Sequence, residues 1–125
     1  MDDKYLRGLD KLTQILGIES ATRALTDFDE INPDIGKYIA KFVYGELYQS
    51  DVLDLKTRQL CTIAALTVLG QYKPHLKTHI VGALNVGASK SEIIEVILQM
   101  LAYAGFPAAT TALAVARDIF VEGNH

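Results

Sequence analysis

The sequence has one cysteine, Cys61, no tryptophan and three prolines among its 125 residues. A single cysteine excludes a disulfide framework within the chain and is typical of proteins in reducing compartments. The polar and acidic residues 1–5 lack the basic start and apolar core of a signal peptide. We therefore expect a cytoplasmic protein without an export signal.

Positive charge is also scarce. Twelve Lys and Arg residues stand against fifteen Asp and Glu residues, giving a net charge of −3, and basic residues form no run longer than isolated pairs. A surface that binds nucleic acid needs a basic field over the phosphates, so we expect no nucleic-acid partner.

Residues 97–116 carry no charge and are long enough by count to cross a bilayer. Gly105 and Pro107 interrupt this stretch, and the sequence Ala-Gly-Phe-Pro is typical of a joint between two helices. We therefore interpret the stretch as two buried helices, and we expect no membrane partner.

Hydrophobic residues are abundant in this chain. Half of its residues are hydrophobic and 22% are charged, at the high end of the range for globular proteins. The length predicts one domain over residues 1–125, and the apolar excess suggests burial against copies of the same chain. Because no segment alternates as a strand does, we predict an all-α fold of six or seven helices.

The first half of the chain contains three expected helices. The first, over residues 5–16, has an apolar stripe and ends at Gly17, Ser20 caps the second, and Asn32-Pro33-Asp34 starts the third. The expected stripe is Leu6, Leu9, Leu12 and Leu16, and the expected buried side of the third helix is Ile35, Tyr38, Ile39, Phe42, Val43 and Leu47. Gly45 lies inside this helix, where glycine is costly, so it predicts a close packing contact.

The second half contains the most apolar helices. Residues 60–69 are almost entirely apolar, which predicts a helix buried on all sides with Cys61 in the core. Gly70 and Pro74 predict that a helix containing two histidines starts near Lys73 and ends near Asn85. Residues 89–92, Ser-Lys-Ser-Glu, match a capping box that begins the next helix.

Chemistry in this chain is expected around His75 and His79, which lie on one helix face because they are four residues apart. His79 could donate a proton to a carbanion or enolate, while Arg58 could hold a carboxylate. Glu46, beside Gly45, is either a solvated carboxylate or an acid facing the histidines. Both histidines could equally be ordinary helix residues bonded to their neighbours.

Metal binding and thiol catalysis are weaker interpretations. A zinc-protease helix needs Glu directly after its first histidine, but Leu76 follows His75, and the sequence nominates no third ligand. Cys61 lies in an apolar helix without a second cysteine to resolve an oxidised form. We therefore predict no metal site and no thiol catalysis.

Several segments, in their order and spacing, resemble those of the gamma-carboxymuconolactone decarboxylase family over nearly the whole chain. These segments are residues 44–48, 56–60, 79–87, 92–96 and 103–109. The resemblance implies a fold shared with alkylhydroperoxidase D and a ring-shaped homo-oligomer, usually a hexamer. It also implies decarboxylation of 4-carboxymuconolactone, an intermediate of aromatic compound degradation, without a cofactor. Arg58 would seat the carboxylates, and His79 would protonate the carbon that loses carbon dioxide.

The sequence departs from the family pattern within the expected pocket, for which we predict Glu46, Arg58, His75, His79, Tyr72 and Tyr103. The decarboxylase-like pattern has Glu where this chain has His75, and Arg where it has Val81. Such changes alter charge and hydrogen-bond donors, so the substrate could differ. Relatives that reduce peroxides use a Cys-x-x-Cys pair, whose positions here hold Tyr72 and His75. The alternatives are an alkylhydroperoxidase-like antioxidant protein with peroxiredoxin activity, using Cys61 alone, and a non-catalytic small-molecule binder.

Overall fold

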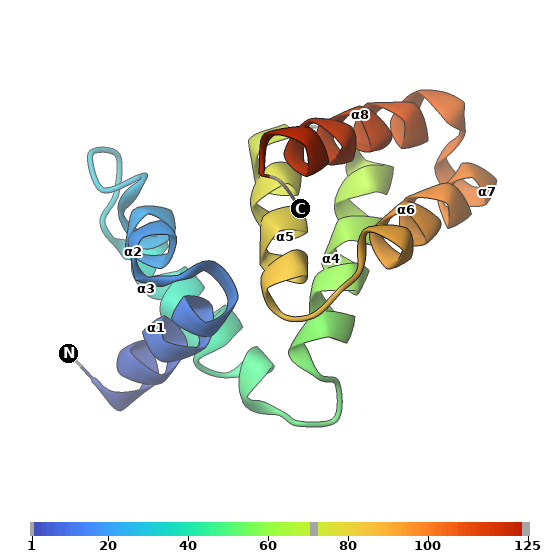
Figure 1. Ribbon diagram of the computed structural model, residues 1–125. Helices are drawn as coiled ribbons and strands as arrows, with labels where there is room; N and C mark the ends of the chain where they lie inside the picture. The colour runs from blue at the N-terminus through green and yellow to red at the C-terminus, as the bar shows by residue number, and fades with distance from the viewer. Residues whose placement is uncertain (1, 71–72, 124–125) are drawn as a thin grey trace. The chain divides into compact units, whose positions relative to one another are not determined.

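The computed structural model describes residues 2–70 and 73–123, and it divides the chain into two compact units, Met1–Asp54 and Leu55–His125 (Figure 1). We describe each unit by itself. Helices and their connections account for both units, and no strand occurs in the described ranges, which confirms the all-α prediction there. The single domain over residues 1–125 stays a prediction.

The first unit consists of short helices. They are α1 (Asp3–Leu16), α2 (Ile18–Thr26), α3 (Asp34–Tyr38), the π-helix η1 (Ile39–Tyr44) and the 3₁₀ helix η2 (Leu47–Gln49). Gly17 ends α1 with a positive φ of 83°, as predicted. The predicted cap at Ser20 is wrong, because α2 already begins at Ile18 and Ser20 lies within it. The predicted helix start at Asn32-Pro33-Asp34 is confirmed, because α3 begins at Asp34 after Pro33. Directly before it, the side chain of Asn32 accepts a hydrogen bond from the Asp34 N–H at 2.8 Å.

Glycines let the backbones of this unit approach each other closely. A Cβ atom on Gly8 of α1 would lie 1.7 Å from the carbonyl oxygen of Ala40 in η1, and one on Gly36 would lie 1.9 Å from that of Leu25. A Cβ on Gly45 would lie 2.5 Å from the carbonyl oxygen of Lys4. This last distance confirms the close contact predicted at Gly45.

These contacts also explain why the predicted buried faces are wrong in part. The residues of α1 that are buried are Gly8, Leu12 and Ile15, while Leu6 is 49% exposed. In the third helix Gly36, Ala40 and Tyr44 are buried, while Tyr38, Phe42 and Leu47 are exposed. Small residues set these faces because they allow backbone contact, and the wider π turn after Tyr38 shifts the 3.6-residue register.

The second unit consists of longer helices, and its boundaries follow the sequence signals. It contains α4 (Leu55–Leu69), α5 (Lys73–Asn85), α6 (Lys90–Gln99), α7 (Leu101–Ala104) and α8 (Phe106–Glu122). Gly70, with φ 62°, ends α4 as predicted. Ser89 and Glu92 form the predicted capping box at the start of α6, with hydrogen bonds of 2.9 and 3.0 Å.

One apolar core joins α4, α5, α6 and α8 (Figure 1). Its fully or almost fully buried members include Ile63, Ile80, Ile93, Ile97 and Ile119. The uncharged stretch of residues 97–116 breaks at Gly105, whose φ is 85°, so the predicted joint between helices is confirmed. Within residues 2–70 and 73–123, no helix combines the length and the hydropathy that crossing a bilayer requires.

The predicted burial of residues 60–69 on all sides is wrong. Cys61 and Ala65 are exposed on α4, and Val68 and Leu69 are 44% and 60% exposed. A uniformly apolar helix has no periodic pattern that distinguishes its buried face from its exposed face. The prediction from the sequence therefore overestimated the burial of this helix. The homo-oligomer and its ring size stay predictions.

Substituting Gly8 with alanine should destabilise the first unit. Alanine favours a helix by roughly 1 kcal/mol over glycine, but the new methyl group would overlap the Ala40 carbonyl and force α1 and η1 apart. We expect a net loss of about 2 kcal/mol or more in the free energy of unfolding, measured by urea denaturation followed by circular dichroism.

Arg7→Ala is the matched control, because Arg7 is the exposed neighbour of Gly8 on the same helix. It should change the free energy of unfolding by less than about 0.5 kcal/mol. Equal stability of the Gly8→Ala variant and the wild type would show that α1 and η1 do not depend on this contact.

Candidate functional site

The site centres on a hydrogen bond between the neighbouring helices α4 and α5. The Nδ1 atom of His79 on α5 lies 2.9 Å from the Oε1 atom of Gln59 on α4, although twenty residues separate them. His79 is half-buried, and Gln59 has 0% exposure. The bond fixes the plane of the imidazole ring, because it holds one ring nitrogen against a buried partner.

Gln59 is the site residue that the sequence analysis missed. It is buried at the start of a stripe that continues with Ile63 and Thr67 at spacings of four residues. A glutamine on the buried stripe of an apolar helix is unusual. This position is the feature of the sequence that could have indicated Gln59 as a candidate site residue. The Nε2 atom of Gln59 is also buried and makes no hydrogen bond to any residue that the structure describes.

Burial keeps the His79 ring neutral. Loss of solvent is the largest cause, and repulsion from the nearby His75 the second, and together they lower the pKa of His79 from 6.5 to about 4. At neutral pH the ring therefore has one protonated and one bare nitrogen. A negatively charged molecule bound against the ring would oppose both effects, because it favours the charged imidazolium.

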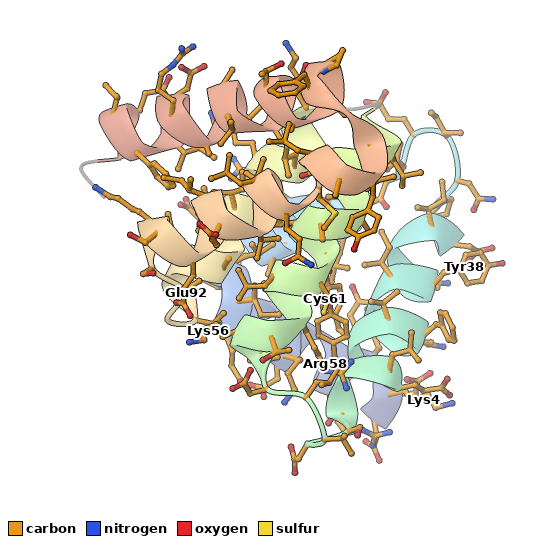
Figure 2. The ribbon with its side chains drawn as sticks, turned by 90° about the vertical axis from the view of Figure 1, so that its right-hand side faces the viewer. Lys4, Tyr38, Lys56, Arg58, Cys61 and Glu92 are labelled. Atoms are coloured by element: carbon orange, nitrogen blue, oxygen red, sulfur yellow. The ribbon has the colours of Figure 1, made fainter. Side chains whose placement is uncertain are left out.

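Arg58 immediately precedes Gln59 on α4 and is half-buried, with its Nε atom out of contact with solvent (Figure 2). His75 lies one turn before His79 on α5 and is exposed. The second unit thus brings Arg58, His75 and His79 onto two adjoining helices. Tyr103 on α7 is 73% exposed, and Tyr72 lies outside the described residues.

Glu46 belongs to the first unit, where it is exposed and forms an ion pair with Lys4 of α1. The side chains of the pair are 44% and 48% exposed, respectively, so solvent screening limits its contribution to stability to about 1 kcal/mol or less. The surface carboxylate of the sequence analysis thus acquires a definite partner. A place for Glu46 beside the histidines stays a prediction.

Cys61 is exposed on α4 (Figure 2), so the prediction of a core cysteine is wrong. Its helix leaves this side open, and a thiol reagent could reach the sulfur. Accessibility to a thiol reagent alone therefore does not distinguish a reactive cysteine from an inert one. Among the described residues, no group of three or more His, Cys, Asp and Glu side chains could hold a metal ion.

The lowered pKa of His79 predicts how the ring and the fold respond to acid. Between pH 6.5 and about 4 the unfolded chain binds a proton at this position that the folded chain does not bind. The contribution of His79 to the free energy of unfolding is therefore complete above pH 6.5 and is lost as the pH falls toward 4. In a titration followed by NMR, the ring should still be neutral at pH 5.5.

His75→Gln is the informative variant for this titration, because it removes the second cause of the shift. We expect the pKa of His79 to rise in the variant while remaining below 6.5, since burial is the larger cause. His79→Gln identifies the signal by its loss. A midpoint of 6 or higher for His79 in the wild type would contradict a ring that burial keeps neutral.

The sequence pattern of the carboxymuconolactone decarboxylase family matches residues 33–118 of this chain. The chain is 34% identical to the 4-carboxymuconolactone decarboxylase of Acinetobacter baylyi, over 95% of this chain and 88% of that protein. It is 31% identical to a nitrosuccinic acid decarboxylase of Metarhizium robertsii, over 78% of this chain and 66% of that protein. An uncharacterized 15.0 kDa protein of Paracoccus denitrificans is 37% identical, over 79% of this chain and 78% of that protein. The matched range covers the positions of Arg58 and His79. This chain belongs to the carboxymuconolactone decarboxylase family.

Proposed function

We propose that this protein is a decarboxylase that acts, without a cofactor, on 4-carboxymuconolactone or a related small carboxylated lactone. The observation that carries the proposal is the Gln59–His79 hydrogen bond, which joins the imidazole on α5 to the residue that directly follows Arg58 on α4. Two relatives of this chain, with different substrates, are both named decarboxylases. In the proposed reaction, a carboxylate of the substrate has to be held and a proton has to reach the carbon.

Arg58 supplies the seat in this proposal. A guanidinium presents two parallel N–H donors to a carboxylate and stays charged at every pH at which the enzyme works. Its half-buried position on α4 strengthens such a contact, since less water competes for the donors. The substrate would thereby be held with a second carboxylate, the one that leaves, free to depart.

His79 supplies the proton. When the carbon–carbon bond to the leaving carboxylate breaks, carbon dioxide departs and the electron pair of that bond stays on the substrate as an enolate. The pair then takes up one proton at carbon. The bound dianion raises the proton affinity of the His79 ring, which in the free protein is neutral with a pKa of about 4. His79 becomes an acid once the substrate is present, and returns to the neutral form after each turnover.

His75 completes the proposed site as a specificity residue. His75 replaces the carboxylate expected at that position in the family, so it presents no negative charge to a carboxylated substrate from the α5 face that it shares with His79. This difference favours a substrate with an additional negative group over a smaller or neutral lactone.

Replacement of Arg58 tests the proposal directly. Arg58→Ala should reduce carbon dioxide release from 4-carboxymuconolactone by about 100-fold or more, because the carboxylate loses a charged pair of donors. The loss should fall mainly on kcat/KM, and circular dichroism should show an unchanged helix content. Release is measured from carboxyl-labelled substrate in single-turnover and steady-state assays.

Lys56→Ala is the matched control. Lys56 precedes Arg58 by two residues on α4 and pairs with Glu92 of α6 at 3.0 Å (Figure 2). The Lys56→Ala substitution therefore removes a positive charge from the same end of α4. The Lys56 side chain is 36% exposed, and its loss should leave decarboxylation within about twofold of the wild type. Equal losses in both variants would indicate a general charge effect. No release by the wild type from 4-carboxymuconolactone or from a related small carboxylated lactone would contradict the proposed reaction.

A further inference from the structure

We infer that Gln59 is a positioning residue that holds the proton on Nδ1 of His79 and so makes Nε2 the ring atom that exchanges protons. The catalytic role that this inference gives to Gln59 rests on the proposed function. The ring nitrogen of His79 that carries the proton can be determined in the free protein, without turnover. The inference about Gln59 and the proposed decarboxylation can therefore be refuted independently.

The hydrogen bond sets the tautomer because of the atom that Gln59 presents. The amide oxygen Oε1, which lies 2.9 Å from Nδ1, only accepts hydrogen bonds. An N–H is thus required on Nδ1 both in the neutral ring and in the imidazolium. The second proton of the ring must then arrive at and leave from Nε2 on every cycle, so the proton is always delivered from one atom in one direction.

The burial of Gln59 indicates that this arrangement is retained at a cost to the fold. Its side chain has 0% exposure, and its Nε2 group is buried without a partner in the described part of the chain. An unpartnered buried donor destabilises a fold, and an apolar side chain of similar length would remove the penalty. A residue kept only for packing at this position, on a stripe with Ile63, would be expected to be apolar.

The opposite orientation of the amide makes the inference falsifiable. If Nε2 of Gln59 donated to Nδ1, the proton of the neutral ring would lie on the Nε2 atom of His79. The two orientations place the proton on different ring nitrogens, and these nitrogens have distinct ¹⁵N shifts. A measurement of the tautomer therefore decides between them.

The experiment uses the full chain labelled with ¹⁵N-histidine at neutral pH, where the ring is uncharged. Two-bond ¹H–¹⁵N spectra report which nitrogen of His79 carries the proton, with His79→Gln to identify the signals. We expect Nδ1–H in the wild type and in Gln59→Glu, which keeps an acceptor oxygen. We expect a mixture of tautomers in Gln59→Met, which has no acceptor at this position.

Activity and stability then separate positioning from packing. Gln59→Met removes the unpartnered Gln59 amide but leaves the Nδ1–H of His79 without an acceptor, so it should melt close to the wild type. It should nevertheless decarboxylate about 100-fold more slowly, at the lower end of what positioned proton transfer contributes. Gln59→Glu should recover part of this loss. Gln99→Met, an exposed site on α6, is the matched control and should change neither property.

A wild-type ring protonated on Nε2 would overturn the inference, as would a Gln59→Met spectrum identical to that of the wild type. The expected tautomers in a protein that decarboxylates neither lactone would support the positioning role and refute the proposed reaction. Wild-type turnover that survives Gln59→Met with a changed tautomer would overturn the role of Gln59 in catalysis.

Discussion

The hydrogen bond between Gln59 and His79 is the polar contact on which the chemistry of the second unit depends. It joins α4 to α5 beside a core that is otherwise apolar, and it places an imidazole at a fixed position relative to the backbone of Arg58. A hydrogen bond in such surroundings is stronger than in water, and an unsatisfied group is correspondingly costly. Burial thus has two effects on the His79 ring: it restricts the orientation of the ring, and it lowers the pKa of the ring.

The apolar core makes this arrangement possible. Ile63 lies one turn beyond Gln59 on α4, Ile80 directly follows His79 on α5, and both are completely buried. Because these neighbours are fixed by packing, the polar side chains beside them have little freedom to reorient. The capping box at Ser89 and the positive φ of Gly105 then direct α6 and α8 onto the same core. The candidate site thus lies on helices, which suits the proton transfer that we propose for His79.

The sequence predicted the features that are encoded locally. The helix ends at Gly70 and Gly105 and the start at Ser89 depend on a few adjacent residues, and all three predictions are confirmed. Burial depends on partners far along the chain, so the exposure of Cys61 could not be deduced from an apolar window. His79 was predicted as a site residue from its spacing, but Gln59 was missed because its contact with His79 forms only once α4 and α5 lie side by side.

The central claim is that a positioned imidazole, rather than bulk water, gives the substrate its proton. The most direct test is to run the reaction in deuterium oxide and determine the configuration of the carbon that takes up the deuteron. Delivery from Nε2 of His79 would place one deuteron on a single face of that carbon. Equal amounts on both faces would mean that solvent protonates a released enolate, and would contradict the account.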